Sequence, residues 1–415
     1  MAVSDKPTES QRDAPANGGL QERVVSVDAL RGFDMFWIVG GEQVAHALEG
    51  IGGGPIVSTL ATQLKHAEWE GLRSYDVIFP LFLFLIGVSI VLSMDRLLRK
   101  SGRSGAIVRI VRRSALLFAI GVFYYGGLTR KWPDIQLSGV LHRIALCYFI
   151  AALLYVFLRK KGIVIAAAVC LIGYWALLMF VPFHDVDLKH DKLKRKASQA
   201  QMVSAEEMLG GVEQRVSGTF EEGRNLAHYV DYRWLPGRKR NLHYTNEGLL
   251  STIGAVATTL FGIMAGWVIT ASSLSKRRKV LWLIGGGAVC VGLGMIWGMQ
   301  CPIIKRIWTP SYCLAASGYS AMLLGMFYLL IDVCQWKRWC TPFLWIGANA
   351  LFIYLAVNLI DFTAIARRMA GGDVTEFVDV RLGDGVGDLM VAVIALALPV
   401  FLVRYLYQRR LFVRL

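Results

Sequence analysis

The stretch LKHAEWEGLRSYDVIFPLFLFLIGVSIVLSMDRLL, residues 64–98, decides what kind of fold this chain adopts. Its second part, residues 76–98, is an almost unbroken apolar run, and a helix of about 20 such residues crosses the hydrocarbon core of a bilayer. Its first part is polar and contains His66, ten residues before Asp76 at the edge of the run. The stretch therefore predicts a membrane-spanning helix that begins beside two titratable side chains.

Apolar runs of this kind recur along the whole chain. Of its 415 residues, 55% are hydrophobic and only 18% are charged, a composition too apolar for an ordinary soluble domain. We predict an all-α, polytopic membrane helix bundle with about ten transmembrane helices. The predicted spans are 30–49, 76–98, 106–127, 140–158, 162–182, 248–270, 280–299, 311–333, 341–360 and 388–407.

The positive charge of the chain is distributed in a regular pattern. The formal net charge is +15, and basic residues cluster in alternate loops and after the last span. This is the positive-inside pattern, which predicts that both termini are cytoplasmic and that His66 and Asp76 face outward. Contact with anionic lipid headgroups explains the basic clusters. They give no indication of a nucleic-acid partner.

The chain divides into two membrane halves around a polar insertion. Residues 1–24 are polar and lack an apolar segment, which predicts a disordered cytoplasmic tail and not a signal peptide. Residues 25–182 form the first half, with the active-site loop, and 248–415 the second. Residues 183–247 are too many for a plain connector and mix aromatic with polar groups, so we expect an outward-facing lid. The glycine-rich segment 371–388 is expected to be a flexible outer turn.

The positions of the cysteines and glycines indicate close packing between helices. The seven cysteines have no C-x-x-C spacing and lie mostly in or beside apolar runs, as small buried hydrophobic residues do. We expect no metal site. The pairs Gly262–Gly266 and Gly294–Gly298 have the spacing that lets membrane helices approach closely. A homodimer is left open by this pattern.

Charged side chains within a membrane usually have a structural or functional role, because each raises the free energy of membrane insertion by about 2.5–3.5 kcal/mol. Asp28 and Arg31 can pair at i, i+3 near the inner end of the first span, either as an anchor or in function. Another group falls in the outer third of the bundle: Glu42, His66, Asp76, Arg143 and Glu247. Each has an ordinary explanation on its own, but their convergence in one layer predicts a site.

His66 is the best candidate for chemistry in that layer. An imidazole can accept a proton near neutral pH or attack an acyl carbon, and Asp76 would hold one ring nitrogen protonated. No metal-ligand spacing competes with it. The residues thus favour proton transfer or acyl transfer by histidine. A proton-coupled transporter of a sugar or organic acid is the alternative, since Asp34, Glu42 and Asp76 would suit a proton relay.

Several motifs, taken in order, resemble one enzyme family. They are SVDALRGFDMFW (26–37), KHAEWEG (65–71), DVIFPLFLFLIGVS (76–89), GVLHRIALCYF (139–149), NEGLLSTIGA (246–255), KRIWTPSY (305–312) and TPFLWIGANALFIY (341–354). Together they make roughly residues 25–360 similar to the heparan-α-glucosaminide N-acetyltransferase family, which has lysosomal and bacterial members. The resemblance implies a transmembrane acyltransferase-like bundle.

The resemblance also implies a reaction and a set of residues. Acetyl would pass from cytoplasmic acetyl-CoA to a terminal glucosamine amine across the membrane, with His66 as base or transient acetyl carrier and Asp76 as its support. The candidate substrate-binding residues are Glu42, Trp69, Arg143, Glu247 and Asn349. The candidate acetyl-CoA-binding residues are Asp28, Arg31, Arg112 and Arg113. O-acetylation of an envelope glycan is an alternative that keeps the same chemistry.

The same expectations predict in which membrane the protein lies and which molecules it binds. We expect an integral protein of a bacterial inner membrane, because no targeting segment precedes the first span. The expected partners are an amino sugar or glycan end and the lipid bilayer, with no nucleic acid.

Overall fold

The computed structural model describes residues 24–51, 54–189 and 213–412, and in this part the chain is mostly helical. The predicted tail, residues 1–24, lies outside the described residues except for its last residue. The helices are α1 (Val25–Gly50), α2 (Pro55–Gln63), α3 (Ile78–Tyr124), α4 (Val140–Phe157), α5 (Lys160–Phe180), α8 (Leu226–Trp234), α9 (Ser251–Thr270), α10 (Lys276–Gly298), α11 (Pro310–Tyr328), α12 (Thr341–Ala348), α13 (Ala350–Leu359), α14 (Phe362–Ala370), α15 (Asp373–Leu382) and α16 (Val386–Gln408). Two short antiparallel pairs join β1 (Phe183–His184) to β2 (Arg215–Val216) and β3 (Phe220–Glu221) to β4 (Arg224–Asn225).

The predicted all-α polytopic membrane bundle is confirmed. Seven helices in the described part of the chain are long and apolar enough to cross a membrane, or up to eight if the bent pair α12 and α13 forms one span. The number is lower than about ten because the predicted spans 76–98 and 106–127 both lie in α3. In addition, every 18-residue window of α1 contains at least three acidic or basic residues, so α1 is too charged to qualify by composition.

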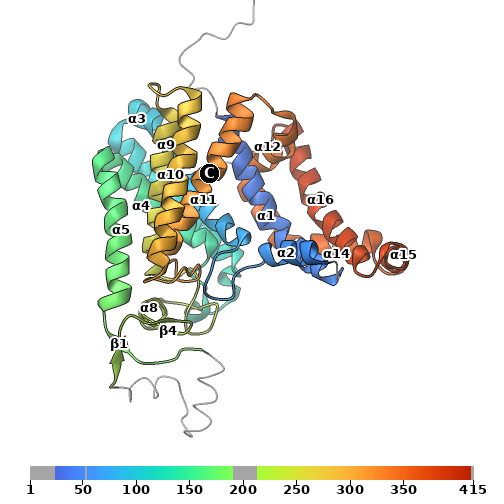
Figure 1. Ribbon diagram of the computed structural model, residues 1–415, viewed down its shortest axis with the longest axis horizontal. Helices are drawn as coiled ribbons and strands as arrows, with labels where there is room; N and C mark the ends of the chain where they lie inside the picture. The colour runs from blue at the N-terminus through green and yellow to red at the C-terminus, as the bar shows by residue number, and fades with distance from the viewer. Residues whose placement is uncertain (1–23, 52–53, 190–212, 413–415) are drawn as a thin grey trace, which may run out of the picture.

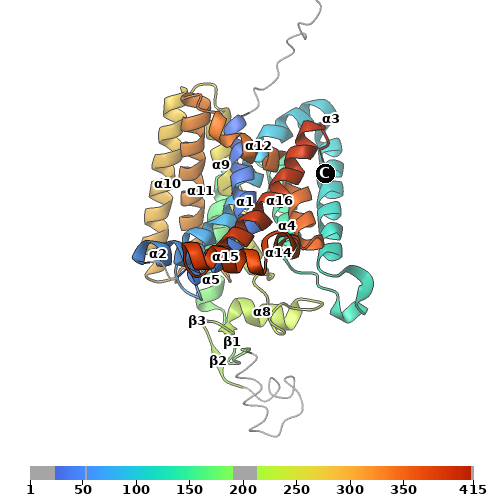
Figure 2. The same ribbon diagram turned by 90° about the vertical axis from the view of Figure 1, so that its right-hand side faces the viewer.

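The long helix α3 is bent at Gly102. This residue has φ 64° and ψ −173° inside an otherwise helical segment, a conformation that suits glycine and strains other residues. The second leg of α3 therefore runs back toward the end of the bundle where the helix began (Figure 2). One continuous element thus supplies two of the predicted spans.

The bundle has two distinct ends (Figures 1 and 2). The N-terminal end contains the start of α1 and the bend of α3. The opposite end, which we call the lid end, contains residues 54–77, 183–189, 213–250 and 360–385, including α2, α8, α14 and α15. The polar insertion and the His66 loop therefore lie on the same side.

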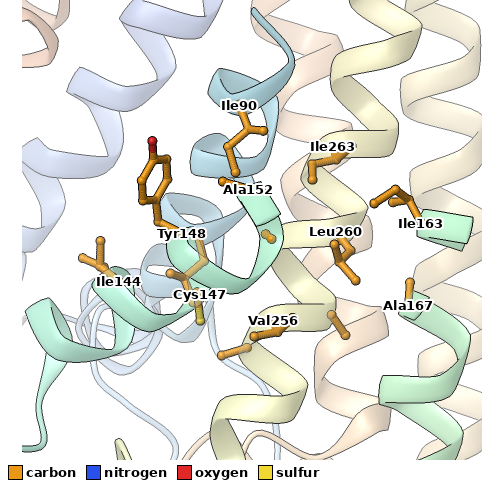
Figure 3. Packing of buried hydrophobic residues seen from close by; sticks show 14 of the residues in the cluster. Ile90, Ile144, Cys147, Tyr148, Ala152, Ile163, Ala167, Val256, Leu260 and Ile263 are labelled. Carbon is orange, nitrogen blue, oxygen red and sulfur yellow. The ribbon is translucent and has the colours of Figure 1, made fainter. Parts of the chain in front are cut away.

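The largest apolar core lies where α3, α4, α5 and α9 meet. Cys147 of α4 packs near Val256 and Leu260 of α9, and Ile163 and Ala167 of α5 lie on the other side of α9 (Figure 3). These side chains are all nearly or fully buried. The cysteine thus acts as a small apolar residue, as expected, and all seven cysteines are free.

Glycines allow α3 and α9 to touch backbone to backbone. A Cβ on Gly262 would lie 1.9 Å from the carbonyl oxygen of Phe84, and one on Gly87 would lie 2.0 Å from that of Thr259. Gly266 also faces α3, through Val91 and Val88. The close packing expected for the Gly262–Gly266 pair is confirmed.

The segment 371–388 differs from expectation. It contains α15 in place of a flexible turn and follows a second short helix, α14. Asp361 caps α14 by accepting a hydrogen bond from the Ala364 amide at 2.8 Å, and Ala366 and Ala370 are buried on the face that packs against α16. The prediction of a turn was wrong because its many glycines lie at the helix ends, as with Gly372 and Gly383 beside α15.

We predict that Gly262→Ala destabilises the bundle by about 1–3 kcal/mol, because the added methyl group has no room against α3. Gly286→Ala is the matched control, since a Cβ there meets nothing within 4 Å, and it should be neutral or stabilising by up to about 1 kcal/mol. Thermal unfolding in detergent measures both. Equal melting temperatures for the two variants would contradict the packing described.

Candidate active site

The carboxylate of Asp76 organises the loop that carries His66. Asp76 lies in a short 3₁₀ helix, Ser74–Val77, directly before α3, and its side chain is fully buried. Its Oδ2 accepts hydrogen bonds from the amides of Ala67 at 3.1 Å and Arg73 at 3.0 Å. Its Oδ1 lies 2.9 Å from Nδ1 of His66. The loop therefore folds back around the carboxylate, and the pair expected from the sequence is in contact.

A third side chain reaches this pair from the second half of the chain. Nζ of Lys305, in the loop between α10 and α11, lies 2.8 Å from Nδ1 of His66 and 3.3 Å from Oδ1 of Asp76. Burial lowers the pKa of Lys305 to about 8, although Asp76 and Glu247 oppose the shift. Sequence reasoning passed over Lys305, because 239 residues separate it from His66.

Aromatic side chains support the group while leaving the imidazole accessible. The ring of Tyr75 lies 4.7 Å from that of His66, centroid to centroid. The Tyr312 hydroxyl donates to the backbone carbonyl of Asp76 at 2.7 Å. The His66 side chain is 53% exposed, so a molecule at the lid end can reach it.

Two further predicted residues lie at the lid end close to this group. Glu42 is exposed on α1. Its neighbour Gly41 packs against Tyr75, since a Cβ added at Gly41 would lie 2.7 Å from the Tyr75 ring. Glu247 is half-buried and close enough to Lys305 for its charge to raise the lysine's pKa. Glu42 thus lies near Tyr75 and Glu247 near Lys305, the two side chains beside His66.

Trp69 and Arg143 are held by structural contacts. The Trp69 indole N–H donates to the carbonyl of Phe220 at 2.8 Å, which ties the His66 loop to the lid. Arg143 is buried, donates to the carbonyl of Gly248 at 3.4 Å, and lies 5.0 Å over the ring of Trp308. Their predicted role in substrate binding stays a prediction, while their observed role is to hold the lid and α9 in place.

Asn349 lies elsewhere. It occupies the break between α12 and α13, where its buried side chain donates to the carbonyl of Leu411 at 3.2 Å. Its neighbours Ala348 and Ala350 line the central cavity described below. The observed contact of Asn349 is thus with the C-terminal segment, and its predicted role in substrate binding stays a prediction.

The lid contains two buried titratable residues that the sequence did not single out. His228 of α8 accepts a hydrogen bond at Nδ1 from the Gly223 amide at 3.0 Å, and burial lowers its pKa to about 3. Asp231 accepts from the Leu249 amide at 2.8 Å, and burial raises its pKa to about 7. Both side chains bond to backbone amides, so they fix the lid fold.

A cavity of about 660 Å³ runs through the bundle behind this site. Its lining is charged toward the N-terminal end, with Asp28, Arg31, Arg96 and Arg113, and apolar toward the lid end. Along α3 the lining extends from Phe79 to Arg96, a rise of about 26 Å at 1.5 Å per residue. Phe79 lies one helical turn beyond Asp76. The cavity thus extends from the N-terminal end to Phe79, one helical turn from Asp76.

Two arginines at the charged end of the cavity are held by contacts with other side chains of the protein. The Arg31 guanidinium donates to the Ser89 hydroxyl at 2.7 Å and pairs with Asp28 at 3.4 Å. Arg113 lies 4.7 Å over the Tyr148 ring, and its Nε has no hydrogen-bond partner among the described residues. Arg31 and Arg113 thus bring two cationic groups to the wall of the cavity.

Arg112 is exposed and does not line the cavity, so its predicted role in acetyl-CoA binding stays a prediction. Neighbouring residues on a helix point about 100° apart, so Arg112 and Arg113 cannot both face inward. Arg96 lines the cavity in its place, together with Ser89 and Ser93. Ser89, Ser93 and Arg96 are spaced i, i+4, i+7, which places them on one face of α3. This spacing is the feature of the sequence that could have identified Arg96.

No group of three or more His, Cys, Asp or Glu side chains arranged to hold a metal ion occurs in the parts of the chain that the structure describes.

Fold and site together define a polytopic membrane protein with a histidine–carboxylate pair at the lid end and a separate cavity among its helices. Residues 23–187 match the protein-family model described as "Heparan-alpha-glucosaminide N-acetyltransferase, catalytic". The resemblance expected from the motifs is confirmed: this part of the chain is similar to that catalytic family. The match contains α1, the His66 loop, both legs of α3, α4 and α5.

Two curated relatives extend the similarity. The chain is 26% identical to human heparan-alpha-glucosaminide N-acetyltransferase over 376 residues, covering 81% of this chain and 53% of the relative. It is 24% identical to the mouse protein of that name over 332 residues, covering 72% of this chain and 49% of the relative. The chain therefore spans about half the length of the curated relatives it matches.

We predict that Asp76→Ala destabilises the fold by about 3 kcal/mol, because two backbone amides and a lysine lose a charged acceptor in a buried place. Glu68→Ala is the matched control, since Glu68 is an exposed carboxylate of the same loop. Thermal unfolding of both variants in detergent measures the difference. A melting temperature of Asp76→Ala equal to that of the control would contradict the organising role of Asp76.

Proposed function

We propose that this protein is a membrane acetyltransferase that moves acetyl from acetyl-CoA, bound from the N-terminal end, to the amine of an amino sugar at the lid end. The observation that carries the proposal is the central cavity, which is cationic at one end and comes within one helical turn of Asp76 at the other. The family of residues 23–187 and the names of both relatives support the same reaction class.

The proposed orientation follows from charge. Basic residues concentrate at the N-terminal end, around the bend of α3 and at the start of α10, and this end would face the cytoplasm by the positive-inside rule. Both termini would then be cytoplasmic, and the His66 group would face the exterior of a bacterial inner membrane. Acetyl-CoA is a cytoplasmic metabolite, so the charged end of the cavity would face the compartment in which acetyl-CoA is found.

The cavity suits the two chemical parts of acetyl-CoA. Arg31, Arg96 and Arg113 would bind the phosphates, since guanidinium groups form strong charge-assisted hydrogen bonds with phosphate oxygens. The apolar stretch toward Phe79 would accept the pantetheine arm. The thioester would then lie beside the His66–Asp76 pair, and the acetyl group would cross most of the bundle without leaving the protein.

His66 would handle the proton that acetyl transfer releases. In direct transfer, the sugar amine attacks the acetyl carbon, Nε2 of His66 takes the amine proton, the C–S bond breaks, and the thiolate receives the proton to give free CoA. In the two-step route, Nε2 attacks the acetyl carbon and the C–S bond breaks, so CoA leaves as a thiolate. The amine then attacks the acetyl group on Nε2, the C–N bond to the ring breaks, and the amine proton passes to the thiolate to give free CoA. Asp76 would hold Nδ1 protonated in both routes, so that Nε2 has a free lone pair.

Glu42 and Glu247 would bind the acceptor. These carboxylates would pair with the ammonium group of an amino sugar or accept hydrogen bonds from its hydroxyls. The acceptor class we propose is a glucosamine-type terminal sugar. Acetylated hydroxyl groups in the product would instead indicate the O-acetyltransferase alternative.

We predict that His66→Ala lowers sugar-dependent release of CoA thiol by at least about 10²-fold, the usual contribution of a general base. The assay uses the full chain in detergent with acetyl-CoA and glucosamine, and a thiol reagent detects free CoA. His46→Ala is the matched control, an exposed histidine at the outer end of α1, and it should keep the wild-type rate.

Two results would contradict the function. A His66→Ala rate within a few-fold of wild type would remove His66 from the mechanism. Sugar flux driven by a pH gradient in proteoliposomes, without any thiol release, would instead favour the transporter.

We predict that Arg96→Ala and Arg113→Ala each raise the KM for acetyl-CoA about 10- to 100-fold, the loss of one charged hydrogen bond to phosphate. Arg112→Ala should leave KM unchanged, because this exposed neighbour of Arg113 points away from the cavity. Steady-state kinetics at saturating sugar measures all three. An equal effect of the three variants would indicate general surface attraction and contradict phosphate binding inside the cavity.

A further inference from the structure

A second cavity lies toward the lid end, between α1, α13, the start of α14 and α16. It has a volume of about 310 Å³, and its lining residues differ from those of the central cavity. The polar residues of its lining are Gln43, Asn358, Asp361 and Thr363, and the others are apolar. The cavity therefore suits a molecule with one polar and one apolar part.

The free polar atoms of this lining are mainly hydrogen-bond acceptors. Oδ1 of Asp361 accepts from the Ala364 amide at 2.8 Å, which leaves Oδ2 for another donor. The side-chain amide of Asn358 donates to the carbonyl of Tyr124 at 3.3 Å, which leaves its own carbonyl oxygen as an acceptor. Asp361 is the one charged residue among the described residues that line the cavity. The lining thus combines several acceptors with a single negative charge.

Pro399 adds a backbone acceptor to the same lining. A proline inside a helix has no N–H, so the carbonyl four residues earlier loses its helical donor. That carbonyl belongs to Ala395, and both Ala395 and Pro399 line the cavity. Because α16 is apolar enough to cross a membrane, a freed carbonyl within it is costly unless another group donates to it. A bound molecule with N–H donors satisfies this carbonyl.

The helices beside the cavity present apolar side chains at the end of the bundle. α14 and α15 lie across the direction of the long helices (Figures 1 and 2), as helices do that lie in a membrane interface. Their exposed side chains include Ile365 and Met369 of α14 and Phe377 and Val380 of α15. Leu359, which lines the cavity, is also exposed. The surroundings therefore favour a lipid over a water-soluble ligand.

We propose that this cavity binds a phospholipid whose headgroup carries a primary ammonium group. The ammonium group has a positive charge and three N–H donors, which match the Asp361 carboxylate and the free carbonyl oxygens of the lining. The acyl chains follow the apolar part of the lining. The bound lipid contacts α1, α13, α14 and α16 together. This site goes beyond acetyl transfer and does not depend on it.

The test compares two lipids that differ in their N–H donors. Phosphatidylethanolamine has a primary ammonium group, whereas phosphatidylcholine has the same charge and no N–H. Native mass spectrometry on the full chain, purified in detergent and stripped of lipid, measures the affinity of each. Phosphatidylethanolamine should bind about 10-fold more tightly, the usual effect of one charged hydrogen bond. Equal affinities would overturn the proposal.

A matched pair of variants tests the site itself. Asp361→Asn removes the charge but keeps a residue type that caps helices well, and it should weaken the binding of phosphatidylethanolamine about 10-fold. Asp388→Asn removes an exposed carboxylate in the first turn of α16, outside the lining, and should leave the affinity unchanged. Wild-type affinity in Asp361→Asn would overturn the proposal.

A second variant covers the case in which Asp361→Asn does not fold. Pro399→Ala gives the Ala395 carbonyl back its helical donor and replaces proline with a better helix former. The binding of phosphatidylethanolamine should then weaken several-fold, because the lining has lost a free acceptor. An unchanged affinity in this variant would contradict the site.

A competition experiment separates a lipid from a soluble amine. Free ethanolamine and glucosamine, each at the same concentration as the lipid, should not displace phosphatidylethanolamine. Displacement by glucosamine would overturn the lipid assignment and show that the cavity takes a soluble amino sugar. None of these measurements needs acetyl-CoA, so failure of the proposed acetyl transfer would leave their outcome unchanged.

Discussion

The structure of the site depends on one buried charge, the carboxylate of Asp76. A fully buried carboxylate is tolerated only when its oxygens are well supplied with donors. Two backbone amides of the His66 loop serve one oxygen, and His66 and Lys305 serve the other. These partners come from both halves of the chain. Satisfying the charge therefore fixes the loop, the first turn of α3 and the segment before α11 relative to one another.

The same helix connects this charge to the cavity. α3 begins directly after Asp76, presents Phe79 one turn later, and carries Arg96 close to its bend at Gly102. Its second leg then returns past the cavity with Arg113. Because one element carries both the histidine's partner and two of the cationic groups, the distance from the charged end to the reactive end is set by helical rise.

The predictions from sequence succeeded where the signal was local. The apolar runs located the helices, and ten residues of spacing brought His66 and Asp76 together. One prediction failed because packing decided the outcome: segment 371–388 was taken for a turn although it contains α15. Side-chain direction also lay beyond the sequence, since Arg96 lines the cavity while Arg112 is exposed. Asn349 lies in a helix break and is tied to Leu411.

The sequence by itself determined the helical membrane architecture and the pairing of His66 with Asp76, because hydropathy and short-range spacing act within a few turns of chain. Only the tertiary structure decided that Lys305, 239 residues away, completes the group, and that a cavity extends from the cationic end of the bundle to Phe79. Contacts of that range depend on how helices pack through residues such as Gly87 and Gly262. No local pattern encodes them, since the space between helices is a property of the assembled bundle.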